Sequence, residues 1–157
     1  MNTSESTPTM AYGDYDLVDR ALAYLESTLT TRGTELSSPR VVRDYLILTA
    51  KHDNREHFRV LWLDAKYRLI ATEDHATGTL TQASVYPREV VRSALEHGAA
   101  ACILTHNHPS GSLEASQADL ALTRHLKSAL ALIDVKLIDH VITFGASATS
   151  LAELGQI

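Results

Sequence analysis

Two histidines separated by one residue, His106 and His108, close an apolar run of the sequence. Residues two apart in a β-strand point to the same side of the sheet, so we expect both imidazoles to project together from the strand end. Asp119 follows eleven positions after His108, at the predicted start of a helix. A loop that returns to the strand end can bring this carboxylate to the two rings. The pattern predicts a site with three metal ligands.

This donor set favours a catalytic zinc ion (Zn2+). Three protein ligands leave one coordination position for water, whereas structural zinc sites usually fill all four positions, most often with thiolates. Cys102 is the only cysteine, which excludes a closed thiolate site and any internal disulfide. Zinc in an open site lowers the pKa of its bound water towards about 7, so that a hydroxide nucleophile exists at neutral pH.

Ordinary structural roles also account for these residues. Ser116 and Asp119 have the spacing of a helix start, where the hydroxyl caps a backbone N–H and the helix dipole favours the acid. Two histidines can equally occupy a polar surface turn. Asp119, however, lies three positions before Leu122 and so extends the apolar stripe of the predicted helix. A carboxylate at an inward-facing position needs a cation.

A further acid begins a predicted core face. Glu56 precedes the segment HFRVLWLDA and alternates with its apolar residues, and buried acids are paired, protonated or functional. A solvated strand end remains the simpler interpretation. Spacing alone does not select this acid over Glu73, Asp64 or Glu89.

The periodicity of the sequence predicts the elements that carry these residues. Apolar three- and four-residue steps predict a helix from Asp14 or Asp16 to about residue 31, and Ser38 with Pro39 predicts the start of a second helix. HFRVLWLDA and YRLIATED are typical of an antiparallel hairpin. A short extended piece, QASVY, is expected to follow.

The second half alternates helix and strand. Pro87 is predicted to begin a helix that Gly98 stops, followed by the buried strand AAACILTH. Ser116 is predicted to begin a long helix, with the strand VKLIDHVITF behind it. Because strands and helices interleave without strict repetition, we expect an α/β fold (an α+β sandwich) around one mixed sheet.

Length and composition limit the class of protein. The 157 residues suit one domain, which we divide into a disordered tail (1–13), an N-terminal helix (14–36) and the main domain (37–157). Fourteen Lys and Arg against nineteen Asp and Glu give a net charge of −5, which argues against a strong binder of nucleic acid. No stretch approaches the roughly 18 apolar residues of a membrane span, and no export signal is evident. A cytoplasmic location is expected.

The string LTHNHPSGSLEASQAD resembles the JAMM signature of the JAB/MPN metallopeptidases. HNHPSG followed by SQAD, together with GTL, SVYPREVV and LIDHVI, resembles the RadC branch of that family from about Ser38 to the C-terminus. The resemblance implies a cytidine-deaminase-like mixed β-sheet flanked by helices. Asp139 and His140, within LIDHVI, belong to this pattern, either beside the metal or as ordinary strand residues. Cys102 is best interpreted as a small buried hydrophobe.

The resemblance also implies roles. His106, His108 and Asp119 match the zinc ligands, Glu56 matches the upstream catalytic glutamate, and Ser116 matches the serine before the aspartate. Glu56 would take a proton from the zinc-bound water and return it to the leaving amine, while zinc and the Ser116 hydroxyl would stabilise the oxyanion. The bond implied is an amide of a peptide or protein substrate, often an isopeptide to a lysine side chain.

One alternative function remains. Longer RadC members look like a helix-hairpin-helix module fused ahead of this domain, and the short form resembles RadC-like proteins of mobile elements. An accessory protein in DNA repair or on such an element would keep the metal site as structure or as an inactive relic. A metal nuclease is disfavoured, because phosphodiester sites more often use two hard cations and clustered carboxylates.

Overall fold

The computed structural model describes residues 17, 19–21, 23–24, 35–36, 38–50, 54–78 and 85–157. The predicted tail (1–13), most of the predicted N-terminal helix and most of QASVY lie outside these residues. Within the N-terminal segment, residues 17, 19–21 and 23–24 are helical, whereas Glu35 forms an isolated antiparallel bridge with Arg68. In the described part of the chain, no helix is long and apolar enough to cross a bilayer.

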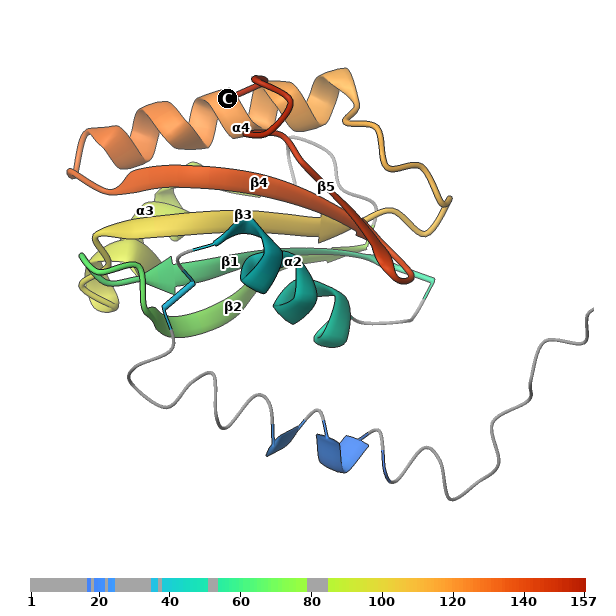
Figure 1. Ribbon diagram of the computed structural model, residues 1–157. Helices are drawn as coiled ribbons and strands as arrows, with labels where there is room; N and C mark the ends of the chain where they lie inside the picture. Colours follow the sequence, from blue (N-terminus) through green and yellow to red (C-terminus); the bar gives the residue numbers. More distant parts are fainter. Residues whose placement is uncertain are drawn as a thin grey trace, which may run out of the picture.

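A mixed sheet forms the centre of the described fold, with the strand order β2-β1-β3-β4-β5 (Figure 1). The predicted hairpin is present as β1 (Glu56–Leu63) and β2 (Leu69–Gly78), which pair antiparallel. β3 (Ala101–Asn107) pairs antiparallel with β1 and parallel with β4 (Lys136–Phe144). β5 (Ser147–Ser150) adds antiparallel to β4. The predicted fold class is confirmed.

The helices begin where the capping residues predicted them. α2 (Pro39–Leu48) follows Ser38, whose hydroxyl oxygen accepts a 3.3 Å hydrogen bond from the backbone N–H of Val41. α3 (Pro87–Glu96) has its proline in the first turn, where the missing N–H costs nothing. α4 (Gln117–Ala131) follows Ser116.

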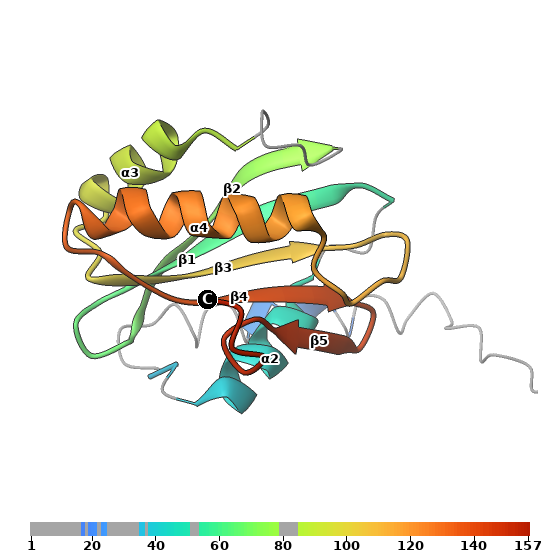
Figure 2. The same ribbon diagram turned by 90° about the horizontal axis from the view of Figure 1, so that it is seen from above.

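The two faces of the sheet bury separate clusters, as strand alternation requires. Phe58, Val60 and Trp62 of β1 pack on the side covered by α3 and α4. Leu61 and Leu63 pack on the opposite side against α2. Figure 2 shows α3 and α4 on one side of the strands and α2 on the other.

Strand pairing brings three chain segments to one end of the sheet. Phe58 near the start of β1 lies opposite His106 near the end of β3, because the two strands are antiparallel. The loop after β3 leads directly into the first turn of α4. The start of β1, the end of β3 and the N-terminus of α4 therefore meet where the candidate site residues lie.

Candidate metal centre

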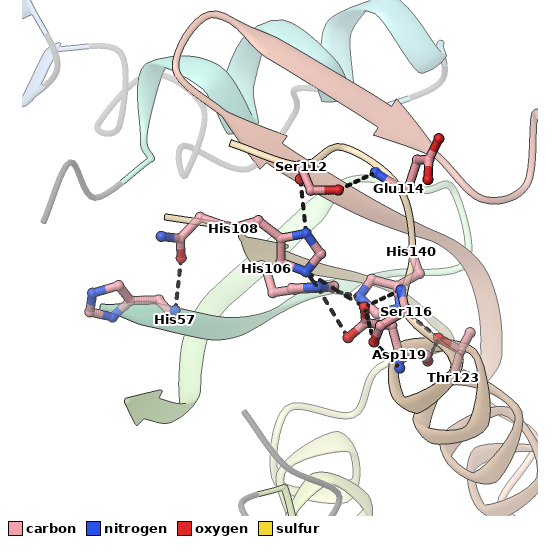
Figure 3. Close-up of polar contacts among 10 residues, drawn as sticks. His57, His106, His108, Ser112, Glu114, Ser116, Asp119, Thr123 and His140 are labelled. Carbon is pink, nitrogen blue, oxygen red and sulfur yellow. Dashed lines mark hydrogen bonds and ion pairs between the residues drawn. The ribbon is translucent and has the colours of Figure 1, made fainter. Parts of the chain in front are cut away.

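His106, His108 and Asp119 converge on one point. Each offers a ligand atom, and these atoms all lie within 4.8 Å of one another (Figure 3). The two Nε2 atoms are 2.8 Å apart; Asp119 Oδ1 lies 3.3 Å from His106 Nε2, and Oδ2 lies 3.5 Å from His108 Nε2. All three residues are buried, with Asp119 8% exposed. The structure thus brings together the three side chains that the sequence singled out.

Asp119 also completes the helix cap that the sequence left as an alternative. Its backbone N–H donates to Ser116 Oγ (3.1 Å), and Ser116 donates to Asp119 Oδ2 from both its backbone N–H and its hydroxyl, each at 2.7 Å. Burial alone would raise the pKa of the Asp119 carboxyl, but hydrogen bonds from the two histidines and Ser116 outweigh burial and hold the pKa well below its usual range. Asp119 therefore both caps α4 and lies against the two histidines.

The loop after β3 orients His108. Nδ1 of His108 donates to the carbonyl oxygen of Ser112 at 2.8 Å, because a carbonyl can only accept. The other ring nitrogen, Nε2, is thereby turned to the cluster. The hydrogen bond with Asp119 raises the pKa of the His108 imidazole, and the negative charge of Glu56 adds to this effect.

His106 is held from behind by two aromatic residues. Its Nδ1 lies 2.7 Å from Nε2 of His140, which is fully buried on β4. Phe58 stacks on the His106 ring at 6.4 Å between centroids and meets the His140 ring edge-on at 5.8 Å. Burial, followed by the charge of His106, lowers the pKa of His140 well below its usual value.

The structure separates the roles of Asp139 and His140, which the sequence left together. The Asp139 carboxylate accepts from the backbone N–H of His140 and from Ser150 and Ala152, so it ties the C-terminal segment to β4. The His140 side chain lies on the other side, directly against His106.

The donor set suits a zinc ion. Two imidazole nitrogens and a carboxylate face one another, and their outward-facing atoms are engaged in hydrogen bonds. Acceptor atoms this close to one another need a proton or a cation between them, and two histidines with one carboxylate are a ligand set of catalytic zinc sites. In the part of the chain that the structure describes, no other group of His, Cys, Asp and Glu meets the same distance criterion.

Glu56 lies at the same end of the sheet as this cluster. It is the first residue of β1, is partly buried, and occupies the strand face of Phe58. Its negative charge adds a smaller contribution to the raised pKa of the His108 imidazole, for which Asp119 is the main cause. The structure thus places the Glu56 carboxylate at the end of the sheet where the two histidines lie.

Three residues of the site were not predicted as such from the sequence. Asn107 and Thr123 were not considered, and His140 was left open between two roles. Asn107 lies between the two histidines, so alternation directs it to the opposite side, and Thr123 lies four positions after Asp119, on the same face of the helix. Only His140 comes from a later element, β4.

A second polar cluster, away from the metal centre, was missed entirely. Glu73 of β2 accepts from the Trp62 indole N–H at 2.8 Å and from the Ser93 hydroxyl, and lies 3.3 Å from His97 Nε2 and 3.6 Å from His75 Nε2. Burial alone would raise the pKa of the carboxyl, but hydrogen bonds from Ser93, Trp62 and His97 lower it to about 2. This cluster ties β2, β1 and α3 together.

A mixed sheet that ends in a His-x-His pair, with an aspartate in the first turn of the following helix, defines a JAB-type domain. Comparison with family models matches residues 36–156 to the RadC-like JAB domain, and the chain belongs to this family. A UPF0758 protein of Thiobacillus denitrificans is 49% identical over 153 residues, covering 96% of this chain and 68% of the relative.

Two further relatives agree. A UPF0758 protein of Bordetella pertussis is 50% identical over 141 residues, with 90% of this chain and 62% of the relative covered. A UPF0758 protein of Azotobacter vinelandii is 54% identical over 124 residues, with 79% and 55% covered. The chain therefore spans about three fifths of the length of the curated relatives it matches.

Proposed function

We propose that the protein is a zinc-dependent hydrolase of the RadC/JAMM type that cleaves a peptide or isopeptide bond with a metal-activated water. One observation carries the proposal: two imidazole nitrogens and a carboxylate, with their outer atoms already bonded, face one another within 4.8 Å. Such a cluster of donor atoms can hold a cation in place of the protons between them, and membership of the JAB family supports zinc as that cation.

His106, His108 and Asp119 would hold the ion. When bound, zinc would lower the pKa of a coordinated water towards about 7 and polarise the scissile carbonyl. Glu56 would accept a proton from the attacking water and deliver it to the leaving amine, a role that general acid–base catalysis makes worth about 10²- to 10⁴-fold in rate. Its place at the start of β1, opposite the end of β3 that carries the two histidines, supports this assignment.

Ser116 would have two roles, holding the Asp119 carboxylate and stabilising the oxyanion. Its backbone N–H and its hydroxyl both donate to Asp119 Oδ2. The backbone N–H alone can keep the carboxylate in place, so the hydroxyl is available to turn towards the oxyanion as charge develops there. The residue is exposed, which lets a substrate reach this hydroxyl.

Metal content tests the first half of the proposal. We expect about one zinc per chain in the purified protein and loss of that zinc in Asp119→Asn. Glu114→Gln is the matched control, because it removes an exposed acid from the same loop region. Zinc binding that survives Asp119→Asn unchanged would contradict the ligand assignment.

Hydrolysis tests the second half. A panel of fluorogenic peptides and of amides linked to the lysine side chain is incubated with the protein, with the chelated protein, and with the chelated protein after zinc is returned. We expect cleavage that disappears on chelation and returns with zinc. A protein that holds zinc but cleaves no member of the panel would favour the accessory role, with the metal as structure.

A further inference from the structure

A buried chain of hydrogen bonds runs from the backbone of α4 to the back of His106 (Figure 3). Thr123 Oγ1 lies 2.6 Å from the carbonyl oxygen of Asp119 and 2.6 Å from Nδ1 of His140. Nε2 of His140 lies 2.7 Å from Nδ1 of His106. Thr123 and His140 are both 0% exposed, so no solvent competes for these bonds.

The direction of each bond follows from counting protons. A hydroxyl has one hydrogen and a carbonyl can only accept, so Thr123 donates to Asp119 and must accept from Nδ1–H of His140. A neutral imidazole carries one N–H, and burial away from solvent disfavours the charged ring. Nε2 of His140 is then an acceptor and takes the Nδ1–H of His106.

We propose that Thr123 and His140 are positioning residues that fix the tautomer of His106, so that its Nε2 lone pair faces the metal position. The inference rests on the proposed zinc site. Asp119 would then have two functions. Its carboxylate is a proposed zinc ligand, and its backbone carbonyl accepts the first hydrogen bond of the series that orients His106. In metal-binding histidines in general, a hydrogen bond from the second ring nitrogen fixes the tautomer and the orientation of the ring.

His106 and His108 differ in the source of the group that holds the second ring nitrogen. The loop carbonyl of Ser112 fixes His108 locally. His106 lies inside β3, where backbone carbonyls are engaged in strand pairing, so a side chain from the neighbouring β4 takes that role. Phe58 packs against both rings and limits their rotation.

Thr123→Val tests this chain of hydrogen bonds without changing a proposed zinc ligand. Valine keeps the shape but removes the hydroxyl oxygen that accepts from Nδ1–H of His140. His140 can then carry its proton on Nε2 and donate it to Nδ1 of His106. The His106 proton is then on Nε2, the atom proposed to bind zinc. We expect zinc affinity, measured by competition with a chromophoric chelator, to fall about 10- to 100-fold. Thr123→Ser keeps the hydroxyl and is expected to stay within about threefold of the native affinity.

The tautomer itself is read in the metal-free protein by ¹⁵N NMR of the imidazoles at alkaline pH, where the rings are neutral. We expect His106 protonated on Nδ1 in the native protein and in Thr123→Ser, and on Nε2 in Thr123→Val. His140→Phe, which retains ring volume but cannot accept, is expected to weaken zinc binding to a similar degree. Urea unfolding of each variant shows whether it remains folded.

Two results would overturn the inference: an Nε2–H tautomer of His106 in the native metal-free protein, or native zinc affinity in folded Thr123→Val and His140→Phe. If the native protein binds no zinc, the proposed function fails, but the NMR measurement still decides whether this chain of hydrogen bonds sets the tautomer. The two failures are therefore distinguishable.

Discussion

The side-chain oxygen of Asn107 accepts a 2.7 Å hydrogen bond from the backbone N–H of His57. The same amide donates to the backbone carbonyl of Arg55 at 2.9 Å, so its two bonds fall on either side of Glu56. The residue between the two histidines of the proposed site thus fixes the start of β1, where the proposed proton-transferring group lies. One tripeptide, His106 to His108, thus carries two proposed zinc ligands and the side chain that holds the backbone around Glu56.

Asn107→Ala is expected to lower turnover while zinc content stays unchanged. Loss of the two hydrogen bonds frees the backbone around Glu56 and costs about 1 kcal/mol in the free energy of unfolding. Hydrolysis rate, zinc analysis and urea unfolding measure the three effects. Asn54→Ala, at a neighbouring exposed position, is the control. Native turnover in Asn107→Ala would show that the position of Glu56 does not depend on these two hydrogen bonds.

Glu56→Gln is expected to keep about one zinc and to lose about 10²- to 10⁴-fold in turnover, because the amide cannot take the proton. Glutamine retains the size of the side chain, so folding should be native. Glu114→Gln should turn over at the native rate. A Glu56→Gln protein with undiminished activity would remove Glu56 from the mechanism.

Gly111→Ala is expected to weaken zinc binding. Gly111 has φ +89°, a conformation unfavourable for alanine, and an added Cβ would lie 3.4 Å from the Phe144 ring. The loop then shifts and loosens the bond from His108 to the Ser112 carbonyl. We expect a loss of roughly 1–2 kcal/mol in stability.

Gly145→Ala is the matched control for that substitution. Gly145 also has positive φ (+54°), but an added Cβ meets nothing within 4 Å. It should lose about 1 kcal/mol of stability and bind zinc normally. Equal zinc affinities in the two variants would contradict the role of the loop.

Glu73→Gln is expected to destabilise the protein in a pH-dependent way. The pKa of Glu73 falls from 4.5 to about 2 on folding, so its charge stabilises the fold above about pH 4.5 and that contribution disappears as the pH falls through about 2. The side chain is 37% exposed, so solvent screening limits the effect to about 1 kcal/mol near neutral pH.

Unfolding measured across this pH range checks the Glu73 prediction. The native protein and Glu73→Gln should differ most near neutral pH and converge under acid conditions. Glu96→Gln, which breaks an exposed 3.7 Å pair with Arg92, should change stability little at any pH. A difference that grows towards low pH would have the wrong sign.

Cys102 is expected to resist alkylation in the folded protein. Burial raises the pKa of its thiol to about 12, so almost no reactive thiolate exists near neutral pH. Mass spectrometry after iodoacetamide treatment should show modification only in denaturant. Rapid labelling of the native protein would contradict the packing of β3 against the core.

Local patterns predicted most of the fold. Ser38 and Ser116 marked the starts of α2 and α4, and alternation along β1 correctly assigned Phe58, Val60 and Trp62 to one face. Helix caps and strand alternation depend on residues a few positions apart, so a single sequence carries them. The approach of Asp119 to the histidines was predictable for the same reason, since only one loop separates them.

The partners of these residues were not predictable in this way. His140 reaches His106 only because β3 and β4 pair in parallel, with Leu104 opposite His140. Glu73 meets His97 only because α3 packs over the hairpin.

The sequence by itself determined the donor atoms and which short segments present them, because side-chain direction repeats with the local backbone. Only the tertiary structure decided which distant side chains hold those donors in place: Thr123 and His140 behind His106, and Asn107 beside Glu56. The physical reason is that strand register and helix docking are settled by the packing of the whole core, where residues far apart in the chain become neighbours.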